Sequence, residues 1–150
     1  MKQILSQTPV DGILLTGGND LSAYGGDAPE RDEVEKLLID WSIENRVPLL
    51  GVCRGMQMLL SVFGVPLRRV SGHIRVEHPL DNGDTVNSYH GWGATACPPP
   101  LHPRAWGPDG VLEAVGHRAY PWIHGIMWHP ERYLPPRPRD VGWIKEVFTL

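Results

Sequence analysis

The stretch LLGVCRGMQMLLSVFG, residues 49–64, decides the predicted fold. It begins with a short apolar run, typical of a strand buried in a parallel sheet, and continues into a segment with helical periodicity. The apolar side chains of that segment are Met56, Leu59, Leu60 and Phe63, and Gly64 ends the predicted helix. Cys53 lies at the junction, between Gly51 and Gly55. The pattern therefore predicts a sharp strand-to-helix turn with a cysteine at its tip.

The residues ahead of this stretch show the same alternation of strand and helix. DGILLTGG, residues 11–18, is an apolar run ended by glycines, which predicts an interior strand buried on both faces. Residues 27–45 predict a helix, with Asp27 as its cap and Pro29 in its first turn. The side chains expected to pack on the sheet are Val34, Leu37, Leu38 and Trp41. Strand, helix, strand, helix is the order of an α/β domain.

The signals beyond Pro66 are weaker and predict shorter elements. They comprise strands within residues 65–70, 84–90 and 125–129, a hairpin around Pro108, Asp109 and Gly110, proline-rich loops at 97–103 and 134–140, and a closing helix at 139–150.

The composition is that of an ordinary globular protein. The chain has 150 residues, of which 41% are hydrophobic and 21% charged, so we expect a single domain over residues 1–150 with one core. The net charge of −3 is spread without long runs of like charge, which argues against a nucleic-acid partner. No apolar run approaches the ~18 residues that span a bilayer, and the start lacks a secretory signal, so we expect no membrane partner and a cytoplasmic location. The two cysteines stand in dissimilar contexts and are expected to be reduced.

Cys53 is a candidate nucleophile because the N-terminus of the following helix favours a thiolate. The competing interpretation, a small buried hydrophobic residue, has about even odds on this motif alone. A nucleophile of this kind needs a base, and His129 follows an apolar run, with Glu131 two residues further on. In an extended segment Glu131 lies on the same side as His129 and can orient its imidazole.

An oxyanion formed by attack of the thiolate also needs hydrogen-bond donors. Gly17 and Gly18 end the first predicted strand, and a backbone N–H from this pair could act together with the N–H of Arg54. The alternative is that Gly17 and Gly18 form only a tight turn.

The histidines give no sign of a metal site. His73 and His78 lie five residues apart in a predicted loop, and no Cys or His pair has the spacing of zinc ligands. We therefore expect solvated histidines and no metal. No nucleotide-binding motif is present, and no cofactor is expected.

Taken together, GVCRGMQ, the earlier TGGND and the later HPE resemble the class I glutamine amidotransferases. The arginine after the cysteine, the segment ERDEVE and the segment VNSYH resemble the γ-glutamyl hydrolase-like branch, which includes the γ-glutamyl-γ-aminobutyrate hydrolases. The resemblance runs from about residue 9 to residue 132. It implies a flavodoxin-like α/β fold with a mostly parallel central sheet and helices on both faces. Family members usually carry a strand, a helix and a second strand before the matching part, so the resemblance implies a chain that is incomplete at the N-terminus.

The resemblance also implies roles for individual residues. Cys53 would attack a γ-glutamyl amide and form a thioester, with His129 as base and later acid, and with Glu131 orienting it. Gly18 and Arg54 would supply the oxyanion donors. The implied substrate contacts are Gly17, Gln57, Asn87, Ser88 and Tyr89, whereas His90 is either a nearby contact or a structural histidine.

Three functions stay open on the sequence. The preferred one is a hydrolase that cuts glutamine or a γ-glutamyl amine, a small-molecule substrate, and releases glutamate. The second is a glutaminase subunit that passes ammonia to a separate synthetase partner. The third is an inactive, truncated homologue.

Overall fold

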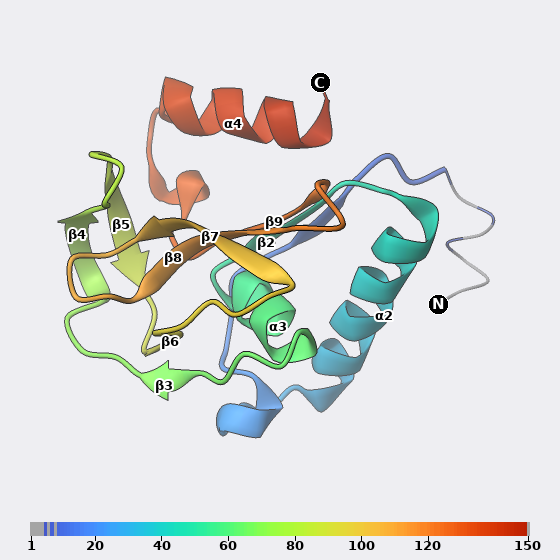
Figure 1. Cartoon of the computed structure of the whole chain (residues 1–150), viewed down its shortest axis with the longest axis horizontal. Coiled ribbons are helices and arrows are strands. Elements are labelled where there is room, and N and C mark those ends of the chain that lie inside the picture. Colours follow the sequence, from blue (N-terminus) through green and yellow to red (C-terminus); the bar gives the residue numbers. More distant parts are fainter. Residues whose placement is uncertain (1–4, 6, 8, 150) are drawn as a thin grey trace.

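The computed structural model describes residues 5, 7 and 9–149, which are built around a five-stranded mixed sheet (Figure 1). Along the sheet the strands are β1 (Ile13–Leu15), β2 (Leu49–Val52), β9 (Ile123–Ile126), β8 (Leu112–His117) and β7 (Leu101–Trp106). The first three pair in parallel, and β8 runs antiparallel to both β9 and β7. Because β1, β2 and β9 are parallel, their carboxyl ends meet at one edge of the sheet, where α/β proteins bind ligands.

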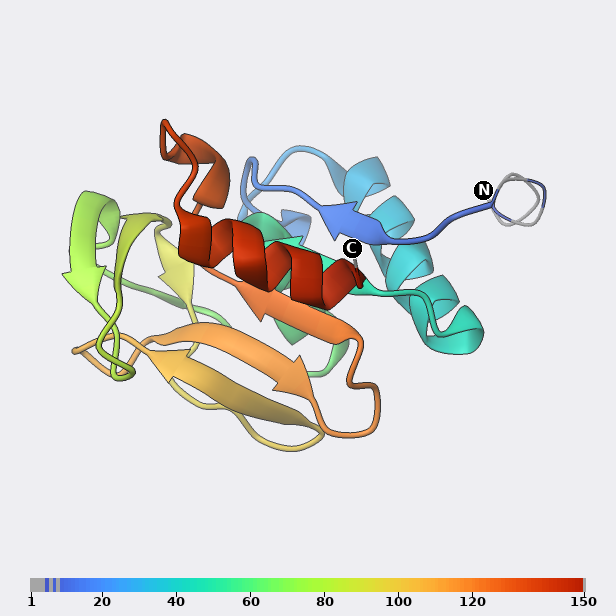
Figure 2. The same cartoon turned by 90° about the horizontal axis from the view of Figure 1, so that it is seen from above.

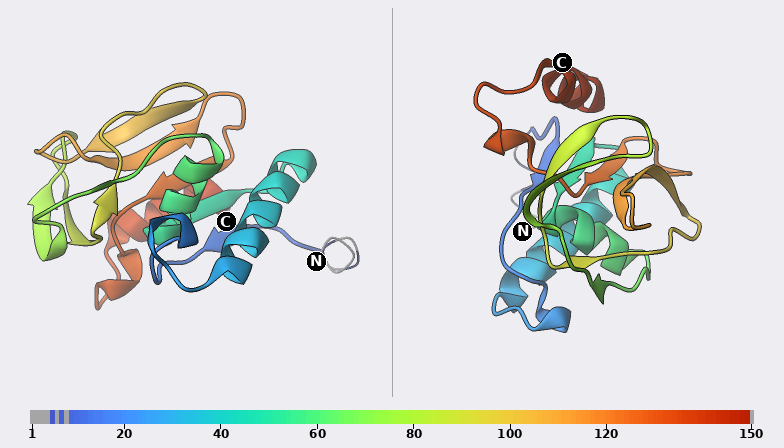
Figure 3. Two further views of the ribbon diagram at one scale, coloured as in Figure 1. Left: turned by 90° about the horizontal axis from the view of Figure 1, so that it is seen from below. Right: turned by 90° about the vertical axis from the view of Figure 1, so that its left-hand side faces the viewer.

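Helices cover both faces of this sheet. Helices α2 (Pro29–Asn45) and α3 (Arg54–Val62) lie on one face, and α4 (Pro138–Phe148) lies across the other (Figures 1 and 2). The side chains of β2 alternate accordingly: Leu49 belongs to the buried cluster of α2 and α3, whereas Leu50 belongs to the cluster beneath α4. The α/β fold class is thereby confirmed. The right-hand view of Figure 3 shows α4 on one side of the sheet and α2 and α3 on the other.

Two small antiparallel pairs stand beside the main sheet. Strands β4 (Ile74–Pro79) and β5 (Thr85–Tyr89) form a ribbon at one end of the molecule, and β3 (Arg68–Arg69) pairs with β6 (Trp92–Gly93). Short 3-10 turns occur at Ser22–Tyr24 and Pro130–Arg132. Within the part of the chain that the structure describes, no helix has both the length and the apolar character needed to cross a bilayer.

The first strand differs from the prediction. Among the described residues β1 lies at one end of the sheet and pairs only with β2. Ile13 and Leu15 face the core, but Leu14 points to the other side and is 55% exposed. The expectation of a strand buried on both faces is therefore wrong for Leu14.

Helix α2 also differs, both at its start and in the face it buries. Pro29 is its first residue, but the cap is Ala28, and Asp27 instead accepts a hydrogen bond from Asn19 Nδ2 at 2.6 Å. The predicted stripe is only half-buried, and the face turned inward carries Asp32, Glu35, Ile39 and Ser42. The physical reason is that two of these side chains form ion pairs with the buried Arg54.

Candidate active site

Cys53 occupies the predicted turn between β2 and α3. Its φ of 51° lies in the left-handed region, which residues other than glycine rarely adopt, so the turn is strained. The flanking glycines allow the close packing that this turn needs. A Cβ on Gly51 would lie 2.6 Å from the backbone of Gly55, and a Cβ on Gly55 would overlap the carbonyl oxygen of Leu15. Strand β1, strand β2 and helix α3 can therefore approach one another only because these positions lack side chains.

The thiol of Cys53 is buried and protonated. Burial raises its pKa to about 12, because the hydrogen bond from the Arg54 backbone N–H offsets only part of the cost of burying a thiolate. The N–H of Arg54 at the start of α3 lowers the pKa of the thiol, in the predicted direction, but burial outweighs this effect. Attack by this sulfur requires a base that removes the proton as the reaction proceeds.

His129 and Cys53 both follow strands that end at the same edge of the sheet. Val52 and Ile126 are partners in the parallel pairing of β2 and β9, and Cys53 N–H donates to Ile126 O at 2.7 Å. His129 follows β9 and is buried, and its Nδ1 lies 2.6 Å from Glu131 Oε1. An Nδ1–H donated to that carboxylate leaves Nε2 free to accept a proton. The predicted pairing of His129 with Glu131 is therefore present as a contact.

Asn87 fixes the backbone of His129 from the ribbon. Its Nδ2 donates to His129 O at 2.9 Å, and its Oδ1 accepts from His129 N–H at 2.8 Å. This side chain is buried and uses both ends of its amide on His129. Asn87 was predicted to contact substrate; the structure shows its side chain bound to the backbone of His129, and the substrate contact stays a prediction.

A cavity of about 350 Å³ opens at this edge, between the ends of β1 and β9. Its lining includes Gly17, Gly18, His129 and Glu131, together with Leu14, Thr16, Val52 and Arg132. Gly17 lies against the imidazole, and a Cβ there would approach His129 Cε1 to 2.8 Å. A glycine at this position therefore leaves room for the ring.

The loop that carries Gly17 and Gly18 is held by a buried ion-pair network that we did not predict from the sequence. The guanidinium of Arg54 pairs with Asp32 and Glu35. Arg31 bridges from Glu35, at 2.8 Å, to the carbonyl oxygen of Gly17, at 3.1 Å. The side chain of Arg54 is thus structural, while its backbone N–H remains at the start of α3. The segment ERDEVE was a usable signal, since it contains the acidic residues of this network.

The remaining predicted contacts divide into two groups. Tyr89 packs edge-on against His129, with ring centres 5.7 Å apart, and the guanidinium of Arg132 lies 4.0 Å from the centre of the Tyr89 ring. Gln57 and Ser88 point elsewhere: Gln57 Nε2 donates to Trp92 O at 3.1 Å, and Ser88 Oγ lies 3.2 Å from His73 Nδ1. The structure therefore brings Tyr89, but neither Gln57 nor Ser88, against the imidazole of His129.

The histidines correct another expectation. His73 and His90 are 3% and 2% exposed, so the prediction of solvated histidines is wrong for them. Among the described residues one group has the arrangement needed to hold a metal ion, formed by His73, His78 and Glu113. Both cysteines are free, as predicted.

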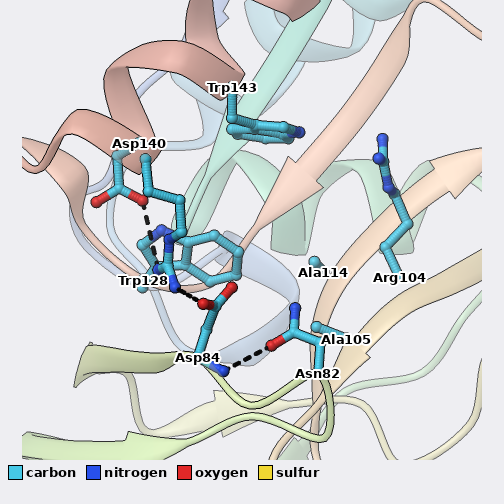
Figure 4. Close-up of a pocket in the computed structure, with 9 residues that line it drawn as sticks. Asn82, Asp84, Arg104, Ala105, Ala114, Trp128, Asp140 and Trp143 are labelled. Carbon is cyan, nitrogen blue, oxygen red and sulfur yellow. Dashed lines mark hydrogen bonds and ion pairs between the residues drawn. The ribbon is translucent and has the colours of Figure 1, made fainter.

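A second cavity, of about 170 Å³, lies beneath α4 and contains no predicted site residue (Figure 4). The indoles of Trp128 and Trp143 form part of its wall. Three of its charged groups bind one another, since Arg139 pairs with Asp84 and with Asp140. This arrangement offers no nucleophile and base pair comparable with the one at the sheet edge.

Comparisons with known proteins identify the family of this chain. Residues 1–148 match the family model described as glutamine amidotransferase class-I. A γ-glutamyl-CDP-amidate hydrolase of Campylobacter jejuni is 34% identical over 145 residues, covering 94% of this chain and 71% of that protein. A γ-glutamyl-γ-aminobutyrate hydrolase of Escherichia coli O157:H7 is 31% identical, covering 87% of this chain and 67% of that protein. The crystal structure of a glutamine amidotransferase from Thermotoga maritima superposes with a TM-score of 0.65 at 21% identity, covering 89% of this chain and 62% of that one.

Proposed function

Because the chain belongs to the class I glutamine amidotransferase family, we propose that it hydrolyses a γ-glutamyl amide through a thioester on Cys53. The observation that carries this proposal is that the strained Cys53 turn and the His129–Glu131 pair both follow the carboxyl ends of two neighbouring parallel strands, β2 and β9. We also propose that residues 1–150 form one domain, for which a single cooperative thermal transition is expected.

The first half-reaction begins with proton transfer. His129 Nε2 takes the proton of the Cys53 thiol as the sulfur attacks the γ-carbonyl carbon, and Glu131 stabilises the imidazolium that results. The thiol pKa of about 12 makes this coupling necessary, because very little thiolate exists beforehand. The tetrahedral oxyanion accepts hydrogen bonds from the backbone N–H groups of Gly18 and Arg54. The carbon–nitrogen bond then breaks, and His129 returns its proton to the departing amine.

The second half-reaction removes the acyl group. Water takes the place of the amine, and His129 accepts one of its protons as the oxygen attacks the thioester carbon. The same backbone donors hold the second oxyanion. Collapse of this intermediate breaks the carbon–sulfur bond, returns the proton to sulfur and releases glutamate.

The relatives support the proposed substrate class. The two curated relatives described above are named for γ-glutamyl amides with different leaving groups, a CDP-amidate and γ-aminobutyrate. We propose that this chain likewise acts on a γ-glutamyl amide, with an amine or ammonia as the leaving group. The second candidate, a glutaminase subunit serving a synthetase, differs in acting on free glutamine.

One assay tests the activity and separates these two candidates. Ammonia release from glutamine and amine release from γ-glutamyl-γ-aminobutyrate are measured on the purified chain without a partner. We expect amine release that is lost in Cys53→Ser and kept in Cys97→Ser, whose cysteine lies outside the candidate site. Turnover of glutamine alone would favour the glutaminase subunit, and equal activity of Cys53→Ser and the unsubstituted chain would exclude the thioester.

A further inference from the structure

Three histidines from separate segments converge on one buried carboxylate. Glu113, on β8, is fully buried, and its Oε1 lies 3.4 Å from His73 Nδ1, 3.5 Å from His78 Nε2 and 3.4 Å from His90 Nε2. His73 precedes β4, His78 lies on β4, and His90 follows β5. Among the described residues neither oxygen of Glu113 has a hydrogen-bond partner, and neither do His78 Nε2 and His90 Nε2. Buried polar atoms aimed at one point without partners call for a ligand between them.

The outer nitrogens of these rings decide where the protons lie. His73 Nε2 lies 2.7 Å from Asp109 Oδ2, a carboxylate oxygen. The outer nitrogens of the other two rings also face acceptors, in their case backbone carbonyl oxygens. His78 Nδ1 lies 3.1 Å from Pro79 O, and His90 Nδ1 lies 3.0 Å from Trp92 O. A neutral imidazole has one N–H, and this N–H lies at the outer nitrogen because that nitrogen faces a hydrogen-bond acceptor. Each inner nitrogen therefore turns a lone pair toward the Glu113 carboxylate, an arrangement that is favourable only with positive charge in between.

The spacing of the inner atoms fits a tetrahedral metal ion. Zinc binds imidazole nitrogen and carboxylate oxygen at about 2.0–2.2 Å, so two ligands of a tetrahedral site lie about 3.4 Å apart. The contacts of Glu113 Oε1 with the three histidines have this spacing. The ligand atoms of His73, His78 and Glu113 all lie within 4.8 Å of one another. The Asp109 carboxylate behind His73 supplies the outer partner that metal-bound histidines usually have.

The charge balance also favours a divalent cation over protons. One divalent ion with neutral imidazoles cancels the charges of Glu113 and Asp109. Protons in place of the ion would instead put positive charges on neighbouring rings, which repel each other. The ring centre of His73 lies 5.0 Å from that of His78 and 4.7 Å from that of His90. One imidazolium, at His73, would still leave the inner nitrogens of the other two rings facing the carboxylate.

We propose that His73, His78 and Glu113 bind a zinc-like divalent cation, with His90, whose Nε2 lies 3.4 Å from Glu113 Oε1, as a candidate for the fourth position. The ion would join β4 to β8 and so tie the ribbon to the main sheet. Because β5 of that ribbon carries Asn87, the ion would also steady the part of the molecule that holds His129. The site is structural and takes no part in the chemistry proposed for Cys53.

The test is a direct measurement of zinc binding. The full chain, without an affinity tag, is stripped with a chelator and titrated with Zn²⁺ against a chromophoric competitor, and its melting temperature is recorded with and without the ion. We expect one ion per chain and a higher melting temperature with zinc. Glu113→Gln and His78→Gln are expected to weaken binding at least 100-fold. Asp109→Asn, which removes only the partner behind His73, is expected to weaken it by about 10–100-fold.

Controls separate this site from other zinc ligands. His102→Gln, on β7 and outside the cluster, and the double variant Cys53→Ser/Cys97→Ser are expected to bind zinc like the unsubstituted chain. If Glu113→Gln does not fold, His78→Gln decides, because His78 lies at the margin of the cluster with 11% of its side chain exposed. Absence of zinc binding by the unsubstituted chain, or binding by the His78→Gln variant as tight as that of the unsubstituted chain, would overturn the proposal and leave a cluster held by protons. None of these outcomes depends on hydrolase activity.

Discussion

Asn87 holds His129 by both backbone groups, with its amide nitrogen 2.9 Å from the carbonyl oxygen and its amide oxygen 2.8 Å from the backbone nitrogen. The two residues lie on different parts of the molecule, since Asn87 belongs to the β4–β5 ribbon and His129 follows a strand of the main sheet. The ribbon therefore determines where the imidazole stands relative to Cys53. We therefore expect Asn87, which is not one of the three residues proposed for catalysis, to act as a positioning residue.

Replacing Asn87 is expected to impair the chemical step more than substrate binding. Asn87→Ala should lower kcat by about 10–100-fold with a smaller change in KM, since small misplacements of a catalytic group are costly. It should also lower the free energy of unfolding by about 1–3 kcal/mol, because His129 backbone groups lose their partners. Asn82→Ala, at an exposed turn of the same ribbon, is the control. A kcat loss shared equally by Asn82→Ala would remove the positioning role.

The two cysteines should respond differently to two reagents. A glutamine-like chloroketone should label Cys53 and spare Cys97, because the reagent occupies the site where His129 can take the thiol proton. Iodoacetamide at pH 8 should react slowly with Cys53, since burial raises its pKa to about 12 and leaves little thiolate. That rate should rise with pH throughout the range from 8 to about 11. Mass spectrometry locates both adducts, and equal chloroketone labelling of the cysteines would contradict the assignment.

The glycine at the start of α3 should tolerate no side chain. A Cβ on Gly55 overlaps the carbonyl oxygen of Leu15, so Gly55→Ala should destabilise the protein by about 1–3 kcal/mol. Gly142 provides a matched comparison, because it lies within helix α4 and a Cβ there would meet nothing within 4 Å beyond its chain neighbours and the backbone of its own helix. Gly142→Ala should stabilise the fold by about 0.5–1 kcal/mol. Chemical denaturation measures both values, and the same sign for the two variants would contradict this account.

The ion pairs of Arg54 and of Lys36 should differ sharply in importance. Arg54 is 1% exposed and faces Asp32 and Glu35, so Arg54→Ala would strand buried carboxylates and should cost about 3–5 kcal/mol. Lys36 pairs with Glu33 on the surface of α2, and Lys36→Ala should change stability by less than about 0.5 kcal/mol. Denaturant titration at matched pH measures the difference. Comparable losses in the two variants would mean that burial does not govern this network.

The sequence predicts best where the signal is local. The turn at Cys53, helix α3 and the contact between His129 and Glu131 depend on residues a few positions apart, and the structure contains all of them. The hairpin at Pro108, Asp109 and Gly110 also joins two strands, β7 and β8, as predicted.

Other features escaped prediction for identifiable reasons. Strand β7 contains Pro103, which marks a loop in sequence, but an irregularity in its pairing accommodates the proline at the end of the sheet. The inward face of α2 is largely polar, so a search for an apolar stripe missed Asp32, Glu35 and Ser42, although the predicted Leu38 and Trp41 do pack against the core. The histidine cluster is non-local, because Glu113 lies well beyond His73, His78 and His90 along the chain. Spacing rules for metal ligands do not detect donors that only tertiary structure assembles.

Strand β9 is paired on both sides, to β2 in parallel and to β8 in the antiparallel direction. Its amides should consequently exchange with deuterium only when the whole domain opens, whereas α4 and the ribbon can detach in smaller openings. Thermal fluctuations that detach α4 or the ribbon would then leave β2 and β9 paired in register. Cys53 and His129, which follow these strands, would keep their relative positions and could return to the closed arrangement directly.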